Sequence, residues 1–390
     1  MNIDILDENF ELVSIIDTYK SFLWVERYSE CGDVELYTNI NSEIINQVRQ
    51  NFHFRINDSD EQMIVEEISY DGENNHILIT GRSLASILDR RIIWGQKILR
   101  YDENADDNNN VKAGGLEEGI KALIDDNIIN PKKPVRDANG NITSYTSFPE
   151  RKISNFRFQY SNDPEIRKIK LKAQYVGDNL YDVIVALCSE HKIGFKVIYD
   201  FKNKEYVFSL YRGVYKPEVV FSPEYDNLEN VKYTETTKEY KNVILIGGEG
   251  ENSSEDDADD EREYVEVGSG IGINRREMFY DASSITHDIE EPNDFDGETK
   301  SLDDDEYTEH LEQKGNEQLQ KYKEVKGIEG EIVNNGMYQY GIDYKIGDIV
   351  ETEDGYGHNC KTRVAEFIHC QDERGYRTYP TFKIDEEDEE

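Results

Sequence analysis

Short runs of alternating apolar and polar residues, at both ends of the chain, constrain its fold more than any other feature. The runs 63–70 and 76–80 flank turn-forming residues, which predicts a hairpin. After these strands the period changes. Leu84 and Leu88 fall at helical spacing behind Ser83, the expected N-cap of a short helix. About six strands with one short helix are typical of a small barrel or sandwich.

The middle of the chain, residues 99–230, shows a different pattern. Apolar positions recur at helical spacing in 116–129 and in 180–191, and Asp178 is the expected cap of the second helix. A hairpin pattern follows at 194–211. These features predict an α+β module.

From about residue 231 the strand pattern returns, with an acidic insertion near 250–263 and a helix near 304–323. Gly315 lies on the apolar stripe of that helix, which indicates a close approach of its backbone to a partner. The two ends of the chain therefore match in element content, although no sequence repeat is detectable.

The length of 390 residues is enough for about two to four domains. Apolar residues make up 37% of the chain, which supplies material for several cores and argues against wholesale disorder. We predict a mainly β fold with an α+β part. The expected division is a barrel domain at 1–98, an α+β domain at 99–230, a second barrel domain at 231–384 and an acidic tail at 385–390.

A net charge of −39 argues against two classes of partner. Phosphate binding rests on Lys and Arg, so we expect no specific nucleic-acid binding and no docking on anionic lipid. Three tracts carry much of the acidic excess: 251–263, 288–309 and 385–390. Such tracts are typical of solvated loops or tails.

No motif specifies catalysis, a cofactor or a metal. The acidic stretch at 102–113 lacks the central glycine and the final glutamate of an EF-hand loop. No nucleophile or phosphate-loop motif occurs, and no two histidines have zinc-ligand spacing. The longest apolar run, 183–188, is far too short to span a bilayer. Four residues close together near the end leave a metal site open as an alternative to ordinary packing: His358, Cys360, His369 and Cys370.

Two clusters stand out, and both are structural in character. In the first, Trp24 and Tyr28 share one face of a strand, and Gly32 permits a turn. Arg27 and Glu35 are placed to pair across the resulting hairpin. The second cluster combines a strand exit, a capped helix and a basic helix end, and its members are Gly81, Arg82, Ser83, Leu88 and Arg91. Both clusters are also typical of a well-packed domain without a special role.

Together the clusters resemble the N-terminal signature of the baseplate-hub, or tail-associated, Gp37-like structural proteins of long-tailed phages. The family pattern is W-x-x-R-Y, a turn glycine and F-E-L, followed by G-R-[DS]-L-x-x-[IL]-L-x-x-R. This chain follows the pattern with Val34 in the usual Phe place. Residues 330–332 and 344–350 resemble the closing barrel of the family.

The resemblance implies two tail-tube-like β-barrels flanking or carrying an α+β middle domain. Three copies would form a homotrimeric, pseudo-sixfold ring. This ring would join the tail tube or distal tail protein above to tip, spike or fibre proteins below, with tape-measure protein in the lumen. The expected location is the tail tip of the virion, after synthesis in the host cytoplasm. Lytic activity in the family usually resides in extra C-terminal domains, so no enzyme is expected in a chain that stops at Glu390.

Several alternatives stay open at this point. The acidic tracts either line a channel, where they would repel passing DNA, or act as solubilising loops on the outside. The leading function is a structural hub. The alternatives are a particle-delivered protein that processes or binds cell-wall glycans, and a free receptor-binding protein.

Overall fold

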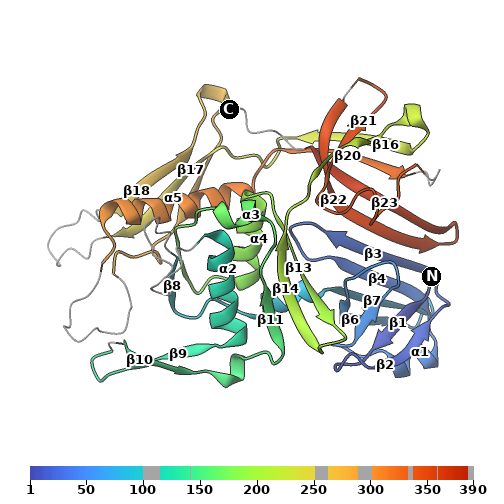
Figure 1. The fold of residues 1–390 in the computed structure, drawn as a ribbon, viewed down its shortest axis with the longest axis horizontal. Helices are drawn as coiled ribbons and strands as arrows, with labels where there is room; N and C mark the ends of the chain where they lie inside the picture. Colours follow the sequence, from blue (N-terminus) through green and yellow to red (C-terminus); the bar gives the residue numbers. More distant parts are fainter. Residues whose placement is uncertain are drawn as a thin grey trace. The chain divides into compact units, whose positions relative to one another are not determined.

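The computed structural model describes residues 1–99, 115–140, 142–250, 262–288, 301–332, 337–357 and 359–384. The chain forms two compact units, each assembled from stretches that are separate in sequence (Figure 1). Unit 1 comprises the described residues of Met1–Ile87, Lys192–Glu235 and Val325–Glu390. Unit 2 comprises those of Leu88–His191 and Thr236–Glu324.

Most of unit 1 is one sheet of 13 strands, with the main order β16-β20-β23-β22-β3-β4-β7-β6-β5-β1-β2. The N-terminal lobe contains β1 (Ile3–Leu6), β2 (Leu12–Ile16), β3 (Ser21–Arg27), β4 (Asp33–Asn39), α1 (Ser42–Gln47), β5 (His53–Arg55), β6 (Met63–Asp71) and β7 (His76–Ser83). The C-terminal lobe contains β15 (Tyr215–Phe221), β16 (Leu228–Thr236), β20 (Val325–Ile332), β21 (Ile349–Glu353), β22 (Asn359–Asp372) and β23 (Gly375–Ile384). A hairpin of β13 (Gly194–Asp200) and β14 (Glu205–Tyr211) also belongs to unit 1.

The long strand β22 joins the two lobes (Figure 1). Its residues 359–363 pair with β21, and its residues 366–371 pair with β3. A register shift between Val364 and Glu366 separates the two segments, while β23 follows the other edge of β22. The two strand-rich ends of the chain therefore share one sheet.

Each lobe buries its own apolar core. Alternate residues of β7, Ile77 and Ile79 among them, point into the N-terminal core, as the two-residue period of a strand requires. Trp24 is the largest side chain of this core and is fully buried. The C-terminal core is separate and includes Phe221 and Phe382, whose rings lie 5.3 Å apart. Full burial of such side chains stabilises a fold by about 1.5–3 kcal/mol each.

Unit 2 combines helices with small sheets. Its strands are β8 (Gln96–Leu99), β9 (Lys132–Arg136), β10 (Ile142–Ser147), β11 (Phe156–Gln159), β12 (Ala173–Val176), β17 (Val243–Gly250), β18 (Arg262–Gly268) and β19 (Glu277–Asp281). Its α-helices are α2 (Leu116–Ile124), α3 (Pro164–Lys168), α4 (Leu180–Glu190) and α5 (Asp304–Gln320). Helix α5 packs on β17 and β18 through Tyr307 and Leu311. A Cβ atom on Gly315 would lie 2.8 Å from Val267, so the predicted close approach at this glycine is confirmed.

The local predictions agree with most of these elements. Both predicted hairpins form, with the registers Asp71–His76 and Asp200–Glu205 at their turns. The short helix after β7 is a 3₁₀ helix, η1 (Leu84–Arg90). The predicted cap Asp178 is wrong. Asn179 caps α4 instead, because its Oδ1 accepts the N–H groups of Tyr181 and Asp182.

The mainly β character of the fold, with several sheets and an α+β part, is confirmed. The three-domain division and the closure of two barrels stay predictions. Most of each acidic tract, the stretch 102–113 and His358 lie outside the described residues. Among the described residues, no helix is both long and apolar enough to cross a membrane.

Candidate functional site

Strands β3, β4 and β7 bring most of the two sequence clusters together. β4 lies between β3 and β7, so that Asp33 is paired with Val25 on one side and with Arg82 on the other. Residues that are about fifty positions apart in the sequence thus become neighbours on one sheet. Leu88 and Arg91 belong to unit 2, which begins at Leu88.

The two aromatic residues of the first cluster anchor β3. Trp24 lies between Val34 of β4 and His369 of β22 in the strand register. Tyr28 is also buried, and its hydroxyl donates to the carbonyl of Lys192 at 3.0 Å and accepts from the Gly213 N–H at 3.1 Å. Tyr28 therefore fixes the end of β3 to the segment that carries β13 and β14.

Gly32 and Gly81 lie where the neighbouring backbone leaves no room for a side chain. A Cβ atom on Gly32 would lie 2.2 Å from the carbonyl oxygen of Val25, and one on Gly81 would lie 1.9 Å from that of Ile64. Gly32 does not have a positive φ, so its role is close packing rather than left-handed geometry. Its N–H donates to Ser83 Oγ at 3.1 Å, and the Ser83 N–H donates back to its carbonyl at 2.9 Å.

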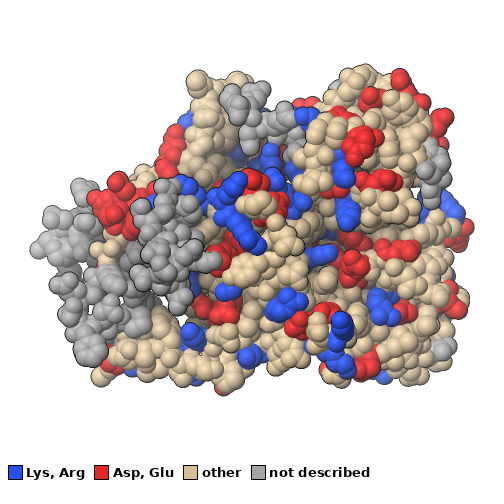
Figure 2. All heavy atoms as spheres, viewed as in Figure 1, with Lys and Arg blue, Asp and Glu red and all other residues tan. Residues whose placement is uncertain are grey.

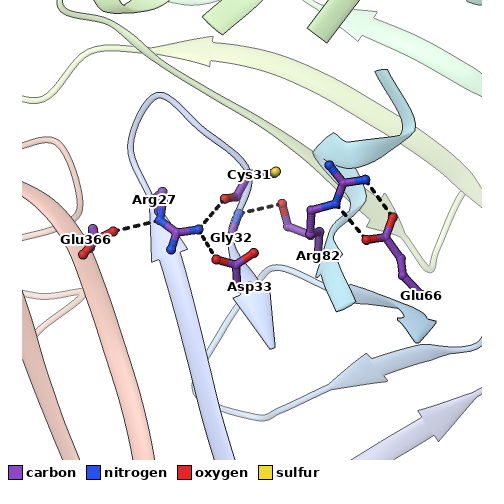
Figure 3. A network of polar contacts seen from close by, with 8 residues as sticks. Arg27, Cys31, Gly32, Asp33, Glu66, Arg82 and Glu366 are labelled. Carbon is purple, nitrogen blue, oxygen red and sulfur yellow. Dashed lines mark hydrogen bonds and ion pairs between the residues drawn. The ribbon is translucent and has the colours of Figure 1, made fainter. Parts of the chain in front are cut away.

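Arg27 links three strands (Figure 3). Its guanidinium donates to Asp33 of β4, to the Cys31 carbonyl at 2.9 Å and to Glu366 of β22 at 2.8 Å. Burial lowers the pKa of Arg27, but the hydrogen bonds to Glu366 and Asp33 outweigh it and raise the pKa above its ordinary value. The predicted pairing with Glu35 is wrong, because the register places Glu35 opposite Leu23, four residues away from Arg27.

Arg82 forms a second, two-pronged ion pair on the same sheet (Figure 3). Its Nε and Nη2 atoms donate to the two carboxylate oxygens of Glu66 at 2.7 and 3.0 Å. Glu66 is the extra residue of a β-bulge, since Val65 pairs with Gly81 and Glu67 with Thr80. The bulge thus supplies the carboxylate that holds Arg82.

A shallow depression of about 360 Å³ covers these ion pairs. Its lining is Leu23, Val25, Arg27, Asp33, Val34, Glu35, Glu66, Thr80, Gly81 and Arg82. Both arginines are neutralised by carboxylates of the same chain. Nowhere in the described ranges do three His, Cys, Asp or Glu side chains come together in a way that suits a metal ion. The arrangement is suited to holding strands together.

A buried acid–histidine cluster at the β3–β22 junction was not predicted. His369 Nδ1 lies 2.7 Å from the Tyr376 hydroxyl, and its Nε2 lies 3.5 Å from Glu26 Oε1. Burial, and then the charge of Glu26, raise the pKa of Glu61 to about 8. The only sequence signal was a glutamate in a buried position of the alternating run 21–27. Each ring nitrogen of His369 therefore has an oxygen neighbour within its own sheet, and the alternative metal site, which includes His358, stays a prediction.

The family model described as Siphovirus ReqiPepy6 Gp37-like protein matches residues 2–382 of this chain. The chain belongs to this Gp37-like family. The predicted family of tail-associated phage proteins is thereby confirmed. No curated protein matches this Gp37-like chain significantly in sequence.

Solved structures give the fold of the Gp37-like chain. It is similar to the 43 kDa tail protein of prophage MuSo2 from Shewanella oneidensis, with a TM-score of 0.52, 11% identity and 98% of each chain covered. The tail protein from Neisseria meningitidis MC58 follows with a TM-score of 0.49, 8% identity and coverage of 98% of this chain and 96% of that one. Prophage tail protein gp18 from Listeria monocytogenes EGD-e has a TM-score of 0.47 and 12% identity, with coverage of 98% of this chain and 94% of that one. At 11% identity, the first of these similarities establishes a phage tail-protein fold and nothing finer.

Proposed function

We propose that this Gp37-like chain is a non-catalytic structural hub of a phage tail, and that three copies form a ring with pseudo-sixfold symmetry. The observation that carries the proposal is the single sheet with two lobes, each around its own core, joined along β3 and β22. Two lobes in each chain give six lobes in a trimer. Such a ring matches a sixfold tube on one side and a threefold tip on the other.

The ends of the sheet support an interface between copies. Among the described strands, β2 is one end of the main path and β16 is the other. β2 exposes Leu12 and Ile15, which are 55% and 49% accessible. An apolar edge strand is an aggregation hazard unless a neighbour covers it. Pairing of β2 in one copy with β16 in the next would cover both edges and continue the sheet around a ring of six tube-like lobes.

We assign the channel of this ring to the passage of DNA or tape-measure protein, with tube or distal tail protein above and tip, spike or fibre proteins below. The net charge of −39 on each copy supports a lumen that repels DNA. Acidic and basic side chains are interspersed on the face seen in Figure 2. The three acidic tracts, which lie mostly outside the described residues, are the proposed source of further negative charge in the lumen.

The test is the oligomeric state of the full chain by native mass spectrometry, alone and with tail tube protein. We expect a trimer, and we expect the Ile15→Lys variant to be monomeric with an unchanged circular dichroism spectrum. Ile273→Lys is the matched control, because Ile273 is 95% exposed in unit 2. A wild-type chain that stays monomeric even with tube protein would overturn the proposal. Turnover of peptidoglycan would favour the glycan-processing alternative.

A further inference from the structure

A depression of about 390 Å³ on unit 2 differs in character from the site on unit 1. It is lined by Asp89, Arg90, Arg91, Ile92, Trp94, Phe148, Glu150 and Arg151. Three arginines thus converge in one hollow of a chain that has 83 acidic and 44 basic side chains. We call it the arginine pocket.

The arginines of this pocket have no carboxylate partner within the described part of the chain. Arg91 donates to the carbonyls of Arg151 and Arg90 at 3.2 and 2.9 Å. Arg151 Nη2 donates to the Ile92 carbonyl at 2.6 Å and to Asn127 Oδ1 at 3.2 Å, but its Nη1 is buried and has no hydrogen-bond partner among the described residues. A buried donor without a partner is costly, and a bound anion would satisfy it.

The electrostatic surroundings of these arginines also favour a bound anion. Burial, and then the charge of Arg90, lower the pKa of Arg91. Burial, and then the charge of Arg91, lower the pKa of Arg151. The two acids of the lining do not relieve these charges by ion pairing. Asp89 Oδ1 accepts from Asn179 at 2.9 Å, and Glu150 is exposed.

One wall of the arginine pocket is aromatic. The rings of Trp94 and Phe148 meet edge to face at 5.5 Å, and the Arg151 guanidinium lies 5.2 Å from the centre of the Trp94 ring. Trp94 is nevertheless 48% exposed, and Ile92 beside it is 45% exposed. Exposed tryptophan next to arginine is the composition of binding hot spots in protein–protein interfaces.

We propose that the arginine pocket binds a short peptide segment of a neighbouring protein, in which a carboxylate side chain stands beside an apolar one. The carboxylate would accept hydrogen bonds from Arg151 Nη1 and from the cations at Arg90 and Arg91, and the apolar side chain would cover Trp94. The pocket volume of about 390 Å³ suits a peptide of a few residues. Asp89, Glu150 and the overall charge disfavour a polyanion such as a nucleic acid or a polyphosphate. This inference goes beyond the hub and does not depend on ring formation.

The two tryptophans provide the experiment. In the full chain, two indole N–H signals are expected by NMR, from the fully buried Trp24 and the exposed Trp94. The probe is the peptide acetyl-Leu-Asp-Leu-Glu-amide, and its control is acetyl-Leu-Asn-Leu-Gln-amide. We expect the acidic peptide to shift the Trp94 signal alone, with at least about tenfold weaker binding for the control and weaker binding at high salt.

Variants separate recognition from folding. Arg90→Ala should weaken binding of the acidic peptide by about tenfold without changing the melting temperature, because Arg90 is exposed. The matched control is Arg275→Ala in the same unit, where Arg275 already pairs with Glu266 and Glu277. Equal binding of both peptides, no shift at Trp94, or a shift only with inorganic phosphate or an oligouronate would overturn the proposal.

Discussion

Arginines of the two signature clusters occupy opposite electrostatic situations in the two units. In unit 1, Arg27 pairs with Asp33 and Glu366, and Arg82 pairs with Glu66. In unit 2, the hydrogen bonds of Arg91 within the described part of the chain go to backbone carbonyls, and its pKa is lowered by burial and then by Arg90. The difference teaches that an arginine with a carboxylate partner in its own chain stabilises the fold, whereas one without such a partner is available for recognition.

The tryptophans give the largest expected contrast between the two regions. Trp24→Ala should cost about 3–5 kcal/mol of unfolding free energy, because the residue is fully buried in the core of the N-terminal lobe. Trp94→Ala should cost less than about 1 kcal/mol, because half of its surface is exposed. Urea unfolding measures both values, and similar losses would erase the distinction between core and binding surface.

Close packing beneath the paired arginines gives the next largest effect. Gly81→Ala should destabilise the chain by about 2–3 kcal/mol, since the new methyl group would meet the Ile64 carbonyl. Gly72→Ala is the matched control in the turn of the same hairpin, where a Cβ atom meets nothing within 4 Å and φ is not positive. Thermal unfolding that leaves the Gly81→Ala variant at the wild-type midpoint would contradict the packing at β6 and β7.

Glu61 tests whether every buried ionisable group without an ion-pair partner among the described residues signals recognition. Its pKa is raised to about 8 from 4.5 by burial and by Glu26, and its Oε2 has no described hydrogen-bond partner. The folded chain therefore holds a proton that the unfolded chain has lost, so the free energy of unfolding should fall by about 2 kcal/mol as pH rises from 5 to about 6.5. Glu61→Gln should remove this loss in urea titrations at the two pH values. An unchanged pH slope in the variant would show that other groups cause it.

Direct removal of the arginines should give the smallest changes. Arg27→Ala should cost about 1–2 kcal/mol, because Asp33 and Glu366 lose their shared cation at a half-buried site. Arg90→Ala should change stability by less than about 0.5 kcal/mol. Chemical denaturation measures the free energy of unfolding of both variants. An equal loss in the Arg90→Ala and Arg27→Ala variants would contradict the difference between the paired and the unpaired arginines.

The sequence could predict those structural elements that depend on residues close together along the chain. The hairpins of β6–β7 and β13–β14 and helix α5 follow from local periodicity and turn residues, and their positions are confirmed. The choice between Asp178 and Asn179 as helix cap could not be made, because both side chains are good caps. The partner of Arg27 could not be found either, since Glu366 is 339 positions away and no spacing rule links them.

The candidate sites show the same limit. Arg27, Arg82 and Arg91 all belong to the signature clusters, and the residues beside them in the sequence do not separate their roles. Whether a carboxylate reaches them depends on the bulge at Glu66, on the pairing of β3 with β22 and on the packing around Arg151. These are properties of the assembled sheets and not of any local window.

The pairing of β3 with β22 has a consequence for synthesis on the ribosome. One edge of β3 must wait for a strand that follows 339 residues later. At roughly 5–20 residues per second, this delay lasts about 20–70 s. During that time the nascent lobe presents an unpaired edge strand. Premature termination before Glu366 would therefore release a fragment that is prone to aggregate through this edge.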